Sequence, residues 1–94
     1  MSDYRIFETD EFRRRLGKLA PGPRSVIAKK LAGYVYPQLR AAPFYGPNIR
    51  KLRGYDPDTW RYRIGSYRVF YCVDEPARIV FLLNLDDRKD ACRK

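Results

Sequence analysis

Residues 60–71 read Trp-Arg-Tyr-Arg-Ile-Gly-Ser-Tyr-Arg-Val-Phe-Tyr, with Gly65-Ser66 between two runs of alternating residues. Alternation of apolar and polar side chains is the period of a β-strand, and glycine at the first position of a two-residue loop is typical of a type II′ hairpin turn. A loop of this length sets the register of the hairpin. We therefore expect Arg63 directly opposite Arg68.

The predicted register divides the hairpin into an apolar face and a basic face. The apolar face is expected in the core and carries Trp60, Tyr62, Ile64, Tyr67, Val69 and Tyr71. Arg61, Arg63 and Arg68 share the other face with Phe70. Arginines opposite each other repel, but a cluster of guanidinium groups is suited to hold phosphate oxygens through paired hydrogen bonds. The simpler alternative is that these side chains extend into water or pair with carboxylates elsewhere.

The rest of the chain predicts an α+β fold in a single domain, residues 1–94. Strands are predicted at residues 4–8, 49–53, 60–64, 67–73 and 79–85. The last of these is apolar on both faces and should be central. The order is thus an N-terminal strand, a two-helix hairpin and an antiparallel sheet of about four strands, followed by a short helical turn at residues 87–93.

The two predicted helices have clear boundary signals. Thr9 or Asp10 is expected to cap the first helix, and Pro21-Gly22-Pro23 should stop it. The second helix is expected to begin near Pro23 or Arg24 and to end or kink at Pro37.

Composition narrows the classes of function. The formal net charge is +9, which favours an anionic partner, nucleic acid before membrane, although a basic surface that serves only solubility is the alternative. Histidine is absent and the two cysteines have no metal-binding spacing, so neither a metal site nor a cofactor is predicted. No apolar run is long enough to span a membrane and the N-terminus lacks a secretory signal, so a cytoplasmic protein is expected.

Three segments carry a resemblance to a known family. They are Lys51-Leu52-Arg53-Gly54-Tyr55, residues 60–71 and Arg88-Lys89-Asp90-Ala91. Together with the order of the predicted elements, they resemble the RelE branch of the RelE/ParE toxins. The resemblance implies the toxin of a type II toxin–antitoxin pair. Such a toxin is a ribosome-dependent endoribonuclease that cuts messenger RNA in the A site, through attack of the 2′-OH and without a metal.

The resemblance also implies roles for individual residues. Arg61, Arg63 and Arg68 match the basic positions that hold and stabilise the scissile phosphate. Further RNA contacts are expected from basic neighbours and from Phe70 on the basic face: Arg50, Lys51, Arg53, Phe70, Arg88 and Lys89. The implied partners are a RelB-like antitoxin, the ribosome and messenger RNA.

The C-terminal segment departs from the family pattern. Relatives commonly have a tyrosine after the Arg-Lys-Asp-Ala stretch and often a histidine before its arginine, where this chain has Cys92 and Asp87. Asp87 is a candidate base, and Cys92 is either a poor substitute or inert. Two alternatives therefore stay open: a catalytically weak relative that binds RNA or the ribosome, and an inhibitor of DNA gyrase like ParE.

Overall fold

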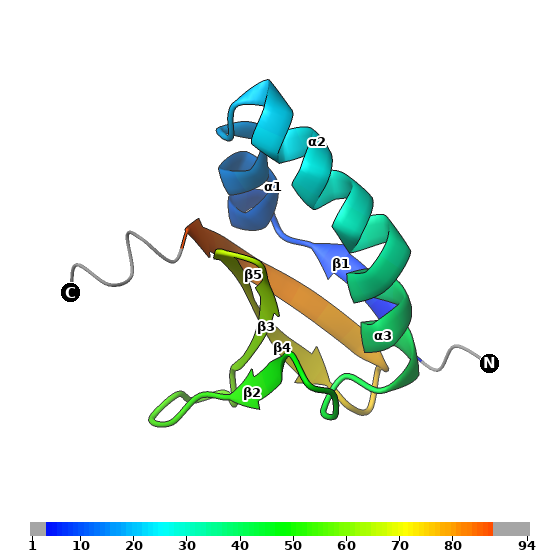
Figure 1. Ribbon diagram of the computed structural model, residues 1–94. Helices are drawn as coiled ribbons and strands as arrows, with labels where there is room; N and C mark the ends of the chain where they lie inside the picture. Colours follow the sequence, from blue (N-terminus) through cyan, green and yellow to red (C-terminus); the bar gives the residue numbers. More distant parts are fainter. Residues whose placement is uncertain (1–3, 88–94) are drawn as a thin grey trace.

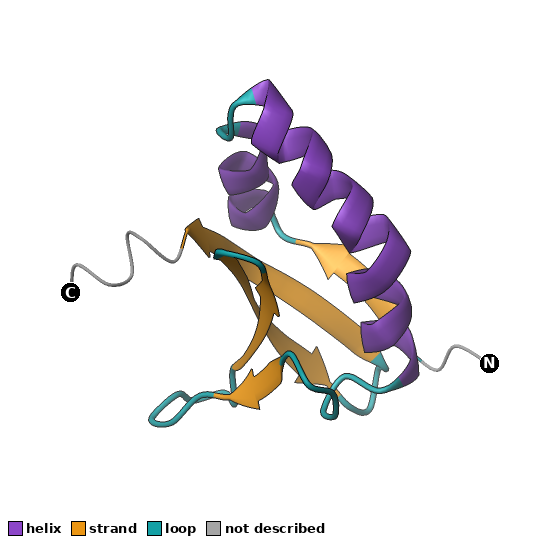
Figure 2. Cartoon of the chain, viewed as in Figure 1, coloured by secondary structure: helices purple, strands orange, loops and turns teal. Residues whose placement is uncertain are grey.

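A computed structural model describes residues 4–87 of the chain, with the side chain of Asp87 left undescribed. Strand, helices and sheet follow one another in the predicted order (Figures 1 and 2). The elements are β1 (Arg5–Glu8), α1 (Asp10–Gly17), α2 (Pro21–Lys30), the π-helix η1 (Leu31–Val35), α3 (Tyr36–Ala41), β2 (Ile49–Lys51), β3 (Trp60–Ile64), β4 (Tyr67–Asp74) and β5 (Ile79–Asp87).

The strands form one five-stranded sheet in the order β1-β5-β4-β3-β2. The N-terminal strand β1 joins this sheet in parallel with β5, so the sheet is mixed where an antiparallel sheet of about four strands was predicted. Pairing with β1 satisfies the backbone N–H and C=O groups along the edge of β5 that β4 leaves open. As predicted, β5 is an interior strand, and it lies between β1 and β4.

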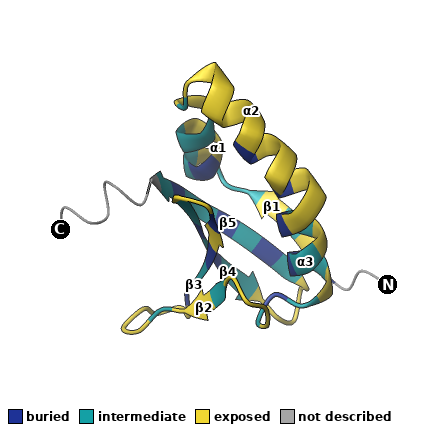
Figure 3. Cartoon of the chain, viewed as in Figure 1, coloured by how far each residue is buried: buried dark blue, intermediate teal, exposed yellow. Residues whose placement is uncertain are grey.

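The helices pack on one face of the sheet and enclose the core (Figure 3). The side chains with the lowest exposure include Phe12 from α1, Leu39 from α3, and Tyr71 and Leu82 from the sheet. Thr9 caps α1 as predicted: its Oγ accepts a hydrogen bond from the Phe12 N–H at 3.3 Å. The same hydroxyl donates to the Leu82 carbonyl oxygen at 2.6 Å, which ties α1 to β5.

The second helical segment begins earlier and runs further than predicted. It starts at Pro21, because proline in the first turn lacks only an N–H that would have no helical partner. Pro37 does not end the segment. The chain widens into the π-helix η1 before it and continues as α3, with Pro37 in the first turn of α3. The wider turn accommodates the proline ring and its missing donor.

The hairpin of β3 and β4 has the predicted register. Arg63 lies opposite Arg68 and Tyr62 lies opposite Val69. Gly65 has a φ of 57°, the left-handed conformation that a type II′ turn requires at its first position. The apolar face packs inward as predicted, and Tyr62 and Val69 are both buried.

Strand β5 extends two residues past its predicted end at Leu85. Asp87 is the last residue of β5 and does not begin a helical turn. Its backbone pairs with Tyr67 of β4, and this pairing keeps it extended. The remainder of the predicted turn, residues 88–93, lies outside the described residues.

Candidate nucleic-acid interface

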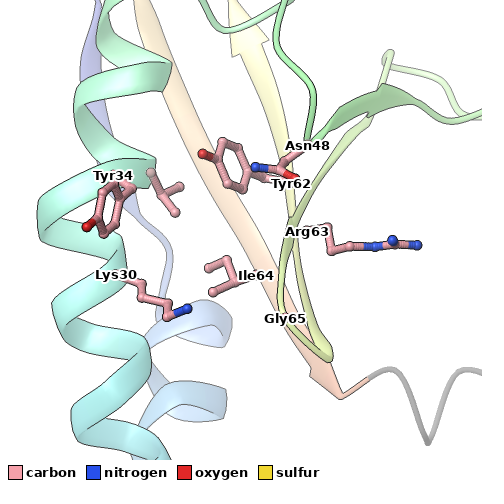
Figure 4. Close-up of a pocket in the computed structure, with 8 residues that line it drawn as sticks. Lys30, Tyr34, Asn48, Tyr62, Arg63, Ile64 and Gly65 are labelled. Atoms are coloured by element: carbon pink, nitrogen blue, oxygen red, sulfur yellow. The ribbon is translucent and has the colours of Figure 1, made fainter.

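Four arginines gather on the sheet face opposite the helices, and we call this group the arginine face: Arg50, Arg61, Arg63 and Arg68. They come from three adjacent strands, with Arg50 opposite Arg61 and Arg63 opposite Arg68. Two like-charged pairs thus sit directly across from each other. Figure 4 shows Arg63 extending from β3 away from the helical layer. The fold therefore presents positive charge over the surface of β2, β3 and β4.

Two of these arginines have donors with no acceptor. The Nε atoms of Arg61 and Arg68 are buried, and neither has a hydrogen-bond partner among the described residues. Burial lowers the pKa of the Arg61 guanidinium, and the positive charges of the neighbouring arginines lower it further. An anion on this face would supply acceptors and opposite charge at the same time.

A hollow next to these arginines has room for such an anion. Its volume is about 340 Å³, and it is lined by Pro47, Asn48, Ile49, Arg50, Arg61 and Arg63. Asn48 adds an amide to the guanidinium groups. The hollow lies open to solvent along the strands, which suits an extended anion such as a nucleic-acid backbone.

Asp86 joins this face from β5, although the sequence analysis did not select it. It lies opposite Arg68 in the register, and one of its carboxylate oxygens is 3.4 Å from Nη1 of Arg15 in α1. An irregularity in β5 changes which side chains face outward, so simple alternation along the sequence does not place Asp86 here.

Of the predicted RNA-binding residues that the structure describes, two lie on or beside the arginine face and two lie away from it. Arg50 lies on the arginine face, and Phe70 lies beside it with the Arg68 guanidinium 5.7 Å from its ring centre. Lys51 is opposite Trp60, one register position away from Arg50, and its Nζ is 3.2 Å from an Asp58 carboxylate oxygen. Arg53 is exposed in the turn after β2.

The remaining predicted site residues belong to the C-terminal segment. The backbone of Asp87 pairs with Tyr67, but its side chain is not described. Arg88, Lys89 and Cys92 lie outside the described residues. The structure therefore leaves their roles in catalysis and RNA binding as predictions.

A second hollow lies on the helix side of the hairpin and shares Asn48 and Arg63 with the hollow on the arginine face. Its volume is about 190 Å³, and Figure 4 shows Lys30 and Tyr34 on the helix facing Tyr62 and Ile64 on β3. Tyr34 is 71% exposed. This groove lies between the two layers of the fold, and two cationic residues, Lys30 and Arg63, line it.

Neither a membrane helix nor a metal-binding cluster is found within residues 4–87. None of the helices there has the length and apolar character needed to cross a bilayer. Nor do three or more acidic, cysteine or histidine side chains gather there in a way that would hold a metal ion.

Comparison with known proteins identifies the fold through solved structures. No family model and no curated protein matches the sequence. A chain of the toxin–antitoxin complex RelBE2 from Mycobacterium tuberculosis is 27% identical with a TM-score of 0.71, and the match covers 92% of this chain and 99% of that one.

Two structures from E. coli agree with this match. A chain of the intact RelBE toxin–antitoxin complex is 27% identical, with a TM-score of 0.65 and coverage of 89% of this chain and 95% of that one. A mutant of the toxin RelE in the free state is 25% identical, with a TM-score of 0.67 and coverage of 97% and 88%. The similarity extends over nearly the whole length of each chain.

Proposed function

We propose that this chain, which has the RelE-like toxin fold, is the toxin of a toxin–antitoxin pair and acts as an endoribonuclease on messenger RNA in the ribosomal A site. The observation that carries the proposal is the arginine face. It combines opposed guanidinium groups with buried Nε donors of Arg61 and Arg68 that lack acceptors in the described chain. A phosphate of RNA would place negative charge between the guanidinium groups and would accept hydrogen bonds from the two Nε donors.

In the proposed reaction the ribose 2′-oxygen attacks the adjacent phosphorus. The new 2′-O–P bond forms as the P–O5′ bond breaks, which leaves a 2′,3′-cyclic phosphate and a 5′-hydroxyl. Negative charge builds on the phosphate oxygens in the transition state, and Arg61, Arg63 and Arg68 stabilise it. The positive guanidinium groups thus take the charge-stabilising role, and no step of the proposed reaction uses a metal ion.

The reaction also moves two protons. A base accepts the proton of the 2′-hydroxyl, and an acid donates one to the leaving 5′-oxygen. Asp87 and Cys92 remain the proposed proton-transfer residues from the sequence, and Asp86 is added because it lies opposite Arg68. Arg15 contacts one oxygen of Asp86 and holds that carboxylate in place.

We also propose an antitoxin as the neutralising partner. Structures of similar chains are described as RelB–RelE complexes, including one from Pyrococcus horikoshii. With a formal charge of +9, this chain suits an acidic segment laid over the arginine face. The affinity of that complex should then fall as ionic strength rises.

Primer extension on a message under translation tests the proposal. Wild-type protein should produce new 5′ ends within A-site codons, and Arg68→Ala should lower the cleavage rate by about two to three orders of magnitude. Arg13→Ala is the matched control, because Arg13 is an exposed arginine of α1. Circular dichroism of each variant verifies that the fold is kept.

Three results would contradict the proposal. Folded wild-type protein that yields no A-site cuts would exclude nuclease activity. If the same protein cosedimented with ribosomes and blocked translation, the weak RNA-binding alternative would replace the nuclease. Inhibition of DNA supercoiling with no effect on translation would favour the gyrase alternative.

A further inference from the structure

A β-bulge shapes the outer face beside the arginines. The pairing of β4 with β5 shifts between Phe70 and Tyr71: Phe70 pairs with Asn84, whereas Tyr71 pairs with Leu82. Leu83 is the extra residue. Leu82 and Leu85 are both buried, so the two residues between them, Leu83 and Asn84, are released from the core face together. Bulges often re-aim side chains in this way next to functional sites.

These two residues form part of a pocket of about 290 Å³. Its lining is mainly apolar with a polar edge: Tyr55, Thr59, Phe70, Leu83, Asn84 and Asp86. Tyr55 comes from the loop between β2 and β3 and is 55% exposed, so its ring is accessible to a ligand in this pocket. The pocket thus has two aromatic residues, a leucine and hydrogen-bonding groups.

The pocket is continuous with the arginine face. The Arg68 guanidinium lies 5.7 Å from the centre of the Phe70 ring, and Arg61 is opposite Phe70 in the sheet. Asp86, at the pocket edge, is opposite Arg68. A group that enters this pocket therefore lies next to any phosphate held by the arginines.

We propose that this pocket receives a nucleobase of the RNA strand whose phosphate the arginine face holds. The inference rests on the proposed function and adds a site for the base. The lining explains why a base fits better than a second phosphate: Asp86 would repel a phosphate, whereas Phe70 and Tyr55 offer ring faces for stacking. The Asp86 carboxylate accepts hydrogen bonds from the N–H groups of a base edge.

Abasic substitution separates the base from the phosphate. Fluorescence anisotropy compares a short 2′-O-methyl oligonucleotide, which cannot be cleaved, with the same oligonucleotide lacking the base at one position at a time. For wild-type protein, loss of the base at one position should weaken binding by on the order of 10-fold, the range expected for one stacked base. Loss of bases elsewhere should have a smaller effect.

Pocket variants then assign the effect to this site. Tyr55→Leu and Phe70→Leu keep apolar volume but remove the stacking rings, so each should bring the ratio between intact and abasic oligonucleotides close to one. Tyr34→Leu is the matched control, because Tyr34 is an exposed tyrosine on the helical side. It should keep the wild-type ratio.

The outcomes distinguish this inference from the proposed function. Arg68→Ala should weaken binding of intact and abasic oligonucleotides equally, and a failure to do so would contradict the phosphate site. If Arg68→Ala behaves as expected but Tyr55→Leu keeps the wild-type ratio, the base pocket is wrong and the phosphate site stands. A Tyr55→Leu variant that loses only antitoxin affinity would overturn the base pocket in favour of a protein docking surface.

Discussion

Replacing Arg61 with methionine should make the protein more stable while removing the RNA cleavage that we propose for it. Arg61 lies opposite Arg50, and its pKa is lowered by burial and by the neighbouring arginines. Its buried Nε–H has no acceptor among the described residues. Methionine keeps a long unbranched stem over the sheet but removes both the charge and the unsatisfied donor.

The magnitude follows from two costs that the substitution removes. A like-charged cross-strand pair costs between a few tenths and about 1 kcal/mol, and an unsatisfied buried donor costs about 1–3 kcal/mol. Arg61 as a whole is half-buried, so solvent screens the charge repulsion, and the lost packing of the longer arginine stem offsets part of the gain at the buried donor. We therefore expect a net gain of about 1 kcal/mol in the free energy of unfolding, or a rise in Tm of about 4–8 °C for a domain of this size.

Urea unfolding at two salt concentrations measures the gain and its electrostatic part. The advantage of Arg61→Met over wild type should be larger at about 0.1 M than at about 1 M salt, because salt screens the arginine repulsion that the variant lacks. Arg13→Met is the control and should change stability by less than about 0.5 kcal/mol. A destabilised Arg61→Met would refute the reasoning, and a gain that salt leaves unchanged would refute its electrostatic part.

Two further predictions concern the turn and the first helix. Gly65→Ala should destabilise the protein by about 1–2 kcal/mol in thermal unfolding, because Gly65 has a φ of 57°. The control Gly17→Ala in α1 adds a methyl group that meets no atom within 4 Å, so it should be neutral or stabilising. Equal effects of the two substitutions would contradict the prediction. The pKa of Glu11 is lowered by hydrogen bonds from Arg14 and then Arg15. Because the pKa of Glu11 is lower in the folded protein, its ion pairs stabilise the fold fully above the unfolded-state pKa, and this stabilisation is lost as pH falls through the folded-state pKa. Glu11→Gln should therefore destabilise the protein at neutral pH and match wild type in strong acid. Urea unfolding across pH measures the difference, and a deficit that persists in acid would count against the ion pair.

The arginine face, which we propose binds RNA, contains features that oppose folding stability. Opposed arginines and unsatisfied Nε donors are local conflicts that a sequence selected for folding alone would avoid. These conflicts lie on the face that the helices leave open, and the helix-covered face follows ordinary core packing.

The sequence alone was sufficient for the hairpin and its two faces. Alternation has a period of two, and a two-residue loop allows one register, so the pairing of Arg63 with Arg68 follows from neighbouring residues. The helix cap at Thr9 and the inward packing of Tyr62 and Tyr71 follow from equally local signals. The helix boundaries were less accurate, because the π-helix that accommodates Pro37 leaves no clear mark in the local pattern.

Only the tertiary structure decided which distant residues meet. Strand β1 pairs in parallel with β5 across the length of the chain, a choice that depends on the exposed edge of β5 and not on the residues of β1 alone. The bulge at Leu83 lies within an apolar run, where alternation is invisible, yet it decides that Asn84 and Asp86 share a face with Arg68. The sequence by itself determined the arginine hairpin, because its register depends on neighbouring residues. The tertiary structure brought Asp86, Tyr55 and Arg15 to the hairpin, because those contacts depend on how distant segments pack and pair.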